Sequence, residues 1–257
     1  DLFNVLGMIG VEPQEGAAVH VIGGGIDPDY LVRFTAAHEH AGFDAVLVGY
    51  TSASAEGFQV AQFAASHTDR ISFLVAHRPG FVAPTLAARK AATFDNLTRG
   101  RLMIHIITGG SGFEQRRDGD FVGHDERYAR TDEYITVMKK AWTSETPFDF
   151  EGRYYAFERA FSEIRCHQTP HVPVYFGGVS PPALGVGAKH ADWYALFGES
   201  RGNVSEMMAT INQHAAEFDR QPRYQLSFRP IIADTESGAW DKAEGLLDRK
   251  STRLNSS

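Results

Sequence analysis

The sequence predicts an α/β fold built on a parallel sheet, of the TIM (β/α)₈ barrel type with its last strand–helix unit missing. Near-continuous apolar runs alternate with amphipathic segments of helix length along the whole chain, which is typical of a parallel sheet covered by helices. About seven such units follow one another, and 257 residues fit one large α/β barrel. The alternative is a doubly wound open sheet, but no turn carries its G-x-G-x-x-G signature.

The first four units occupy residues 2–142. Their strands are expected at 2–9, 43–50, 71–78 and 101–108, and their helices at 28–42, 55–67, 83–100 and 128–142. Gly42 and Gly100 follow the first and third helices, as glycines that end helices commonly do, and Pro79-Gly80 ends the third strand.

The remaining units follow a predicted hairpin in "DFEGRYYAF", with Glu151 and Gly152 at its turn. Strands are then expected at 172–178, 191–199 and 224–233, and helices at 181–190, 203–219 and 235–248. Residues 1–248 therefore form a single predicted barrel domain. Residues 249–257 break the helical pattern and resemble the translated read-through of a sequencing adapter, so we interpret them as a non-native tail, with a natural disordered tail as the alternative.

The composition is that of an ordinary globular protein, with 43% hydrophobic and 22% charged residues. Its one cysteine, Cys166, cannot form an internal disulfide, which favours a reducing, cytoplasmic location. No apolar run approaches the roughly 18 residues that span a bilayer, so no membrane partner is expected. The net charge of −7 argues against nucleic-acid binding, although a local site can still attract an anion.

The carboxyl ends of the strands are where a barrel of this type carries its active site. The fifth strand runs into "FGGVSPPALG", where Gly177 and Gly178 allow close backbone approach and Ser180 precedes a helix. The N–H groups of Gly178 to Ser180, together with the helix N-terminus, would suit a phosphate. An ordinary capped helix start is the alternative interpretation.

Two further strands carry polar residues near their ends. His105 and Thr108 lie on the fourth strand, and a hydrogen-bonded core histidine is an equally acceptable interpretation of His105. On the seventh strand, alternation places Gln225, Ser227 and Arg229 on the face opposite the apolar residues, hence toward the barrel interior. A buried guanidinium needs an anionic partner, which could be a structural carboxylate or a substrate anion.

A long polar loop separates the fourth strand from its helix, and ordered loops of this length usually bind something. The sequence has no Walker motif, no H-E-x-x-H, no G-x-S-x-G and no zinc spacing. A phosphate cradle without an acid–base dyad suggests that a cofactor carries the chemistry.

Four stretches, "FLVAHRPGFVAPTLAARKAATFDNLTRGRL", "IITGGS", "GHDERYARTDEY" and "PVYFGGVSPPAL", resemble the bacterial luciferase-like superfamily and, within it, the FMNH₂-dependent alkanesulfonate monooxygenases. The resemblance runs from the first strand to about Asp248. It implies a TIM-barrel enzyme that takes reduced FMN from a separate NAD(P)H-dependent flavin reductase and uses O₂. In the alkanesulfonate monooxygenases the products are an aldehyde and sulfite.

The resemblance also implies roles for cofactor-binding residues. His105 corresponds to a polar residue beside the isoalloxazine ring, and Thr108 to a strand-end residue near the ring. Tyr128 would reach the FMN phosphate, whose site Gly178, Val179 and Ser180 would complete. Residues 109–126 would form a wall over the flavin.

The implied substrate residues depart from those of the desulfonating members. Ser54 stands where those members have a cysteine, Phe197 where they have a tryptophan, and Ser227 and Arg229 where they have an arginine and a histidine. We expect Arg229, Ser54 and His77 to be catalytic. Phe197, Ser227 and Arg78 are expected to line the substrate pocket.

The leading hypothesis is a two-component flavin monooxygenase that acts on a small anionic organosulfur compound, in the first place an alkanesulfonate, with a sulfone as another possibility. The alternatives are an FMN- or deazaflavin-dependent hydride-transfer oxidoreductase on the same fold, and a non-catalytic flavin-binding relative. The resemblance implies a homo-oligomer, either a dimer or a tetramer. No metal is expected.

Overall fold

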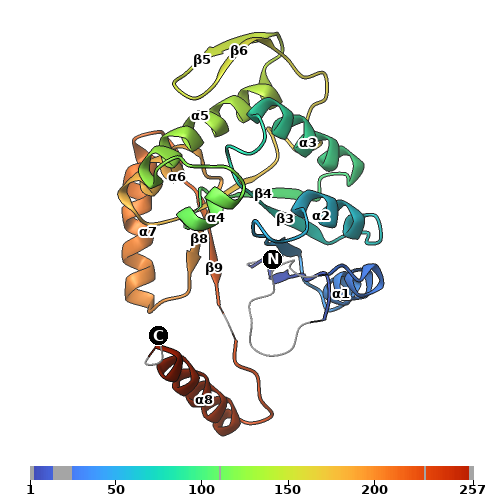
Figure 1. Ribbon diagram of the computed structural model, residues 1–257, viewed down its shortest axis with the longest axis vertical. Coiled ribbons are helices and arrows are strands. Elements are labelled where there is room, and N and C mark those ends of the chain that lie inside the picture. The colour runs from blue at the N-terminus through green and yellow to red at the C-terminus, as the bar shows by residue number, and fades with distance from the viewer. Residues whose placement is uncertain (1–2, 14–24, 110, 229, 255–257) are drawn as a thin grey trace.

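A computed structural model describes residues 3–13, 25–109, 111–228 and 230–254. Its centre is a curved sheet of seven strands in the order β1-β2-β3-β4-β7-β8-β9, and every neighbouring pair is parallel. Helices cover the convex side of the sheet, so the strands form an incomplete barrel of the TIM type (Figure 1). Among the described residues β1 and β9 are the two edges, which agrees with the predicted barrel that lacks its last unit.

The first four strand–helix units follow the predicted order. They are β1 (Leu6–Met8), α1 (Pro28–His40), β2 (Ala45–Val48), α2 (Gly57–Ala65), β3 (Ser72–His77), α3 (Pro84–Leu97), β4 (Leu102–Ile106) and α5 (His124–Thr143). Local chemistry explains the helix starts: the Asp27 side chain accepts a hydrogen bond from the Tyr30 N–H at 2.9 Å, and Pro28 begins α1. Helix α5 begins at His124, four residues before the predicted start at Tyr128.

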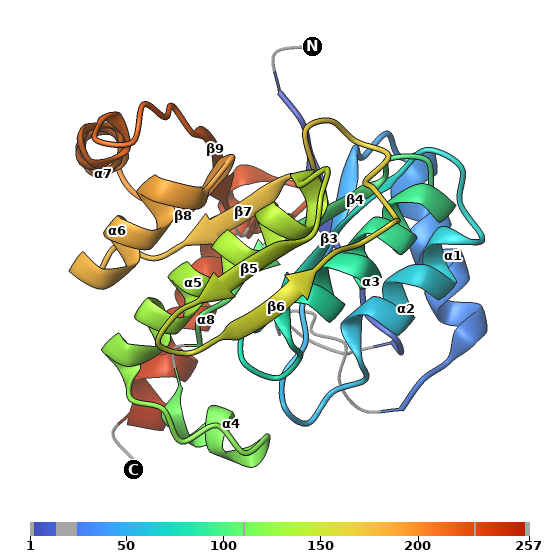
Figure 2. The same cartoon turned by 90° about the horizontal axis from the view of Figure 1, so that it is seen from above.

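The second part of the chain contains the predicted hairpin and the last three units. Its elements are β5 (Phe148–Glu151), β6 (Ala156–Ala160), β7 (Val174–Gly177), α6 (Pro181–His190), β8 (Trp193–Phe197), α7 (Arg201–Ala216), β9 (Arg223–Ser227) and α8 (Glu236–Leu254). The antiparallel hairpin β5–β6 lies over α5, outside the barrel (Figure 2). The Glu133 carboxylate on α5 holds its turn by accepting the N–H groups of Arg153, Tyr154 and Tyr155.

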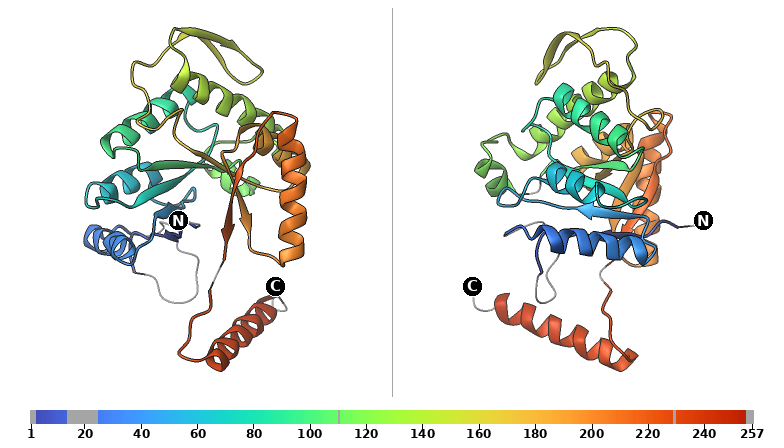
Figure 3. Two further views of the ribbon diagram at one scale, coloured as in Figure 1. Left: turned by 180° about the vertical axis from the view of Figure 1, so that it is seen from behind. Right: turned by 90° about the vertical axis from the view of Figure 1, so that its right-hand side faces the viewer.

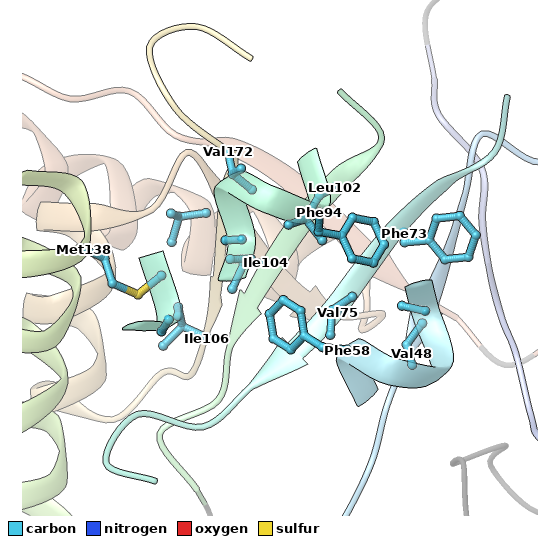
Figure 4. Close-up of a cluster of buried hydrophobic side chains, with 14 of the residues drawn as sticks. Val48, Phe58, Phe73, Val75, Phe94, Leu102, Ile104, Ile106, Met138 and Val172 are labelled. Carbon is cyan, nitrogen blue, oxygen red and sulfur yellow. The ribbon is translucent and has the colours of Figure 1, made fainter. Parts of the chain in front are cut away.

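The convex face of the sheet supplies the hydrophobic core. Side chains such as Phe73 and Val75 on β3 and Ile104 on β4 are fully buried against Phe58 of α2 and Met138 of α5 (Figure 4). The concave face of the last strands carries the stacked aromatic pair Tyr175 and Trp193. Two positions further along these strands, its residues are small or polar, so these positions lie toward the carboxyl ends.

The last unit departs from the prediction. Strand β9 ends at Ser227, whereas a strand over 224–233 was expected. The Tyr224 hydroxyl contacts α7 by donating to Asn212 Oδ1 at 2.7 Å, but Leu226 and Phe228 on the same face are 39% and 66% exposed. The reason is that β9 is an edge strand and α8 does not cover it: in Figures 1 and 3, α8 lies apart from the sheet.

Helix α8 also extends to Leu254, past Asp248, where the sequence pattern predicted its end. The non-native origin of residues 249–257 stays a prediction, and residues 255–257 lie outside the described residues. Within the described ranges, no helix combines the length and the apolar composition that crossing a bilayer requires.

Candidate active site at the carboxyl ends of the strands

The start of α6 has the geometry of an anion site. Gly178 has φ +130°, and a Cβ there would stand 2.8 Å from the Ala183 Cβ and 3.5 Å from the Tyr128 hydroxyl oxygen, so only glycine fits. Ser180 precedes the helix, yet its side chain makes no capping hydrogen bond, and its buried Oγ has no hydrogen-bond partner. The structure therefore brings Tyr128, Gly178 and Ser180 together at the positive end of a ten-residue helix.

Val179 and Thr108 border this site differently. Val179 is 56% exposed and borders the hollow between α6 and α7. Thr108 is buried at the end of β4, with its hydroxyl 3.4 Å from that of Thr131 on α5. Thr108 thus ties the strand end to the helix that carries Tyr128.

His105 lies on the concave face of β4. Its Nε2 is 3.6 Å from the position that a Cβ on Gly177 would occupy, and no other side chain stands between it and that part of β7. The surrounding protein lowers the pKa of His105 to about 4 by desolvation. Because the side chain is only half-buried by area, water reaches it and we expect a smaller shift; its ring is neutral at pH 7 in either case.

His77 has the opposite placement. It pairs in register with Ile106, one residue beyond the pair of Ala76 and His105, so its side chain points to the convex face. There its Nε2 lies 2.7 Å from the Tyr134 hydroxyl, and its ring meets Phe58. Desolvation, with smaller contributions from Lys90 and Arg78, lowers its pKa to about 4. The structure does not bring His77 together with His105.

Arg78 fastens the loop that follows β4. This loop contains a short helix, α4 (Gly112–Arg117), which the sequence did not predict. Arg78 Nη2 lies 2.6 Å from Asp118 Oδ2, and Glu114 accepts a hydrogen bond from the Ser52 N–H at 3.1 Å. Two nitrogens of the buried guanidinium, Nε and Nη1, have no hydrogen-bond partner.

Two arginines that sequence reasoning missed complete this wall. Arg130 Nη2 lies 2.6 Å from Asp120 Oδ2, and both side chains are almost fully buried. Arg127 donates to the carbonyl oxygens of Gly109 and Val122, each at 2.8 Å. The sequence did contain a signal for them: Arg127 and Arg130 stand close to Tyr128, beside a long loop with two aspartates. Arginines in such a position could have been predicted to form ion pairs with that loop. The loop is thus held by one buried ion pair and by hydrogen bonds from Arg127 to backbone carbonyls.

Ser54 is occupied by its own turn. Its Oγ accepts the Thr51 N–H at 2.9 Å and lies 2.8 Å from the Thr51 hydroxyl. This turn follows β2 and adjoins Ser52, which contacts α4. Ser54 is therefore close to the loop wall, with its hydroxyl already engaged.

The predicted substrate residues on the last strands lie at the rim. Phe197 pairs in register with Ser227, and both are exposed, Phe197 to 78%. Arg229 lies outside the described residues. Gln225, two residues before Ser227, has a buried Oε1 without a hydrogen-bond partner, and the sequence alternation already placed it on the inner face.

The described part of the chain contains no group of three or more His, Cys, Asp or Glu residues that could hold a metal ion. Two hollows of about 510 Å³ each lie beside the region, one between α6 and α7 next to Val179 and one under Phe121 beside Asp120. Neither hollow is lined by His105, so the candidate site lies at the strand ends and not in these hollows.

The family model of luciferase-like monooxygenases matches residues 5–255 of this sequence. The chain therefore belongs to the luciferase-like monooxygenase family, as its resemblance to that superfamily indicated. The match includes every strand of the curved sheet and the loop wall over β4.

Solved structures share the fold. A riboflavin lyase with modified FMN and riboflavin has a TM-score of 0.80 at 18% identity, over 95% of this chain and 66% of its own. A monooxygenase from Streptomyces bottropensis has a TM-score of 0.75 at 21% identity, over 98% of this chain and 79% of its own. An F420-dependent secondary alcohol dehydrogenase has a TM-score of 0.72 at 19% identity, over 87% of this chain and 68% of its own. The chain thus spans just under two thirds of the length of the riboflavin lyase.

Proposed function

We propose that the protein is a flavin-dependent monooxygenase that binds FMN at the carboxyl ends of β4 and β7. The observation that carries the proposal is the unpaired, buried Ser180 Oγ at the start of α6. A buried hydroxyl without a partner costs stability, and a bound anion would satisfy it. Membership of the family and the likeness to an FMN-containing structure support the same ligand.

Each residue of this site has a role that its position supports. The Ser180 hydroxyl donates a hydrogen bond to a phosphate oxygen. The Tyr128 hydroxyl, which lies beside Gly178, donates a second hydrogen bond to the phosphate. Pro181 and Pro182 have no N–H, so the backbone donors are those of Val179, Ser180 and Ala183. His105, neutral at pH 7, offers the ring one hydrogen-bond donor and one acceptor without a charge.

The reduced flavin supplies the electrons that activate O₂ for transfer of one oxygen atom to the substrate. Ser180, Tyr128 and His105 bind and orient the cofactor, and the wall over β4 limits the access of water to it. In this proposal a separate NAD(P)H-dependent flavin reductase delivers the reduced FMN. The substrate is a small organosulfur anion, in the first place an alkanesulfonate that yields an aldehyde and sulfite, with Arg229 as its cation.

Hydride transfer is the second candidate. The likeness to an F420-dependent secondary alcohol dehydrogenase favours it, because that enzyme shares the curved sheet. The two candidates differ in their need for O₂. Turnover that continues without oxygen and reduces a deazaflavin would select hydride transfer.

Ser180→Ala tests the cofactor site. Since the buried Ser180 hydroxyl makes no capping bond and has no partner, its removal is expected to leave the flavin-free protein at least as stable to heat. The same removal is expected to weaken FMN binding about tenfold, as for a lost hydrogen bond to a charged group. Fluorescence quenching measures the affinity. Ser66→Ala is the matched control, because Ser66 is an exposed serine that donates to Phe63 O at the far end of α2. An FMN affinity that Ser180→Ala leaves unchanged contradicts the site.

The activity is tested with a flavin reductase in air and a panel of alkanesulfonates. Sulfite release that requires O₂ and disappears in Arg229→Ala would support desulfonation. If reduced FMN binds and is oxidised but no sulfite appears, the organosulfur assignment fails and the monooxygenase proposal continues with other substrates. If neither flavin binding nor turnover occurs, the monooxygenase proposal itself fails.

A further inference from the structure

Four residues on neighbouring strands line the concave face between β4 and β9. Gly177, Ala195 and Gln225 are partners in register on β7, β8 and β9. His105 on β4 stands beside them, with its Nε2 3.6 Å from the Cβ position of Gly177. The two middle positions are small, whereas the two outer positions are polar.

The small residues create a flat floor. A Cβ on Gly177 would stand 3.2 Å from the Ala195 carbonyl oxygen and 3.8 Å from the Ala195 Cβ, so the floor is closely packed and has no room for a larger side chain. Strands lie roughly 4.8 Å apart, so β4 and β9, three strand steps apart, are separated by on the order of 14 Å. A planar three-ring heterocycle fits this span with a polar group at each end.

Gln225 faces this floor. The Tyr224 hydroxyl reaches α7 on the convex side, so alternation turns the next residue, Gln225, to the concave side. Arg223 confirms this direction, because its guanidinium lies 5.4 Å from the ring centroid of Trp193, which stacks on Tyr175 at 5.4 Å. This stack borders the floor on the amino-terminal side of the strands, two residues before Gly177 and Ala195.

The Gln225 side chain has an unmet hydrogen-bonding requirement. Its Oε1 is buried, and no atom of the described residues bonds to it. A primary amide offers one acceptor and a two-proton donor side by side, whichever way it is turned. The pyrimidine edge of a flavin carries alternating carbonyl and N–H groups, which are complementary to such an amide.

We propose that Gln225 binds the pyrimidine edge of the flavin ring through its side-chain amide, with the ring lying over Ala195 and extending toward His105, whose imidazole stands against Gly177. This inference rests on the proposed function and adds the residue that fixes the orientation of the ring. Ser180 binds the phosphate, whereas Gln225 recognises the heterocycle. The two residues therefore act on different parts of one ligand.

The experiment compares FMN with riboflavin, which has the same ring and no phosphate. Gln225→Leu is expected to weaken the binding of both flavins by a similar factor, roughly tenfold, since the same hydrogen bonds are lost. Ser180→Ala is expected to weaken FMN alone. Fluorescence quenching gives both affinities, and Gln59→Leu, at an exposed position on α2, is the control.

Thermal unfolding without flavin separates a binding role from a structural one. Removal of an unsatisfied buried oxygen is expected to raise the melting temperature of the flavin-free Gln225→Leu protein by a few degrees. A melting temperature that falls would make Gln225 a structural residue and overturn the inference. Gln225→Glu, which keeps the size but loses the donor, is expected to weaken both flavins as well.

The outcomes distinguish the two proposals. If the unaltered protein binds FMN and Gln225→Leu binds it equally well, only the inference on Gln225 fails. If Gln225→Leu weakens FMN but not riboflavin, recognition of the ring is contradicted. If the unaltered protein binds neither flavin, the proposed function fails and the inference with it.

Discussion

His77 and His105 lie near the ends of adjacent strands, and their environments are opposite. His77 is 6% exposed on the convex face, where its Nε2 lies 2.7 Å from the Tyr134 hydroxyl and Phe58 packs against the ring. His105 faces the concave side, beside the bare backbone of Gly177. Burial lowers the pKa of His77 to about 4 and also lowers that of the half-buried His105, so both rings are neutral at pH 7.

This difference shows how the two faces of the sheet divide their tasks. The convex face satisfies its polar groups internally, as His77 does with Tyr134, and therefore contributes to stability. The concave face leaves polar groups such as Gln225 Oε1 unsatisfied, which costs stability and is typical of a ligand site. Substitutions at matched positions should separate these two roles.

Replacement of the two histidines gives the largest expected contrast. His77→Ala removes a fully packed ring and leaves the Tyr134 hydroxyl without its partner, so the free energy of unfolding should fall by roughly 2–4 kcal/mol. His105→Ala should cost less than about 1 kcal/mol, because its side chain is only half-buried, and should weaken FMN binding. Urea denaturation at pH 7 measures both costs. Equal losses of stability would contradict the division of the faces.

The pH dependence of stability tests the same contrast without a change in packing. In the unfolded chain a histidine has a pKa near 6.5, whereas folded His77 has a pKa of about 4. Below pH 6.5 the unfolded state therefore binds a proton that the native state does not, and stability falls as the pH falls toward 4. His77 should make the protein roughly 2 kcal/mol less stable at pH 5 than at pH 7.

The control for this pH effect is His77→Gln, which retains a hydrogen-bonding side chain and does not titrate. Urea denaturation at pH 5, 6 and 7 should show a smaller decrease of stability in this variant than in the unaltered protein. The same decrease in both proteins would show that His77 does not carry the effect. His105→Gln should change the decrease less than His77→Gln does, because water already reaches His105.

The sequence predicted the order of strands and helices because their signals are local. Apolar runs mark the strands, and α3 ends at Leu97, three residues before Gly100, the glycine that was expected to end it and that has φ +90°. The start of α6 was equally local, since Gly178, Ser180 and Pro181 lie within four positions. The cradle could therefore be predicted from a short stretch, although binding of FMN there remains a proposal.

The resemblance implied a wall over residues 109–126, but its helix and its contacts could not be predicted, because the contacts join distant residues. Helix α4 has six residues and is fixed by contacts from Glu114 to Ser52 and from Asp118 to Arg78, 62 and 40 positions away. Likewise, the sequence does not show to which face of the sheet a strand residue points until the register of the strands is known. His77 and His105 both stand near strand ends in the sequence, and only the pairing of His77 with Ile106 shows that they point to opposite sides.

Two tyrosines on α5 give a smaller, matched contrast. Tyr134→Phe removes the hydroxyl that bonds His77 in the convex layer, and should cost about 1 kcal/mol of stability without changing FMN binding. Tyr128→Phe removes a hydroxyl near Gly178 and should leave stability unchanged while weakening FMN more than riboflavin. Thermal unfolding and fluorescence titration of both variants decide this. Weaker FMN binding by Tyr134→Phe would show that the two layers are coupled.

Phe197 gives the smallest expected effect on stability and tests the rim of the concave face. Its side chain is 78% exposed, so Phe197→Ala should change the free energy of unfolding by less than about 0.5 kcal/mol. If Phe197 lines the substrate pocket, the variant should raise the KM for an apolar-chain sulfonate and leave FMN affinity unchanged. Leu196→Ala is the control on the convex face, because Leu196 is 4% exposed and its truncation should cost roughly 2–5 kcal/mol. An unchanged KM in Phe197→Ala would show that Phe197 does not line the substrate pocket. Its exposed ring beside Ser227 would then contact neither the core nor the substrate.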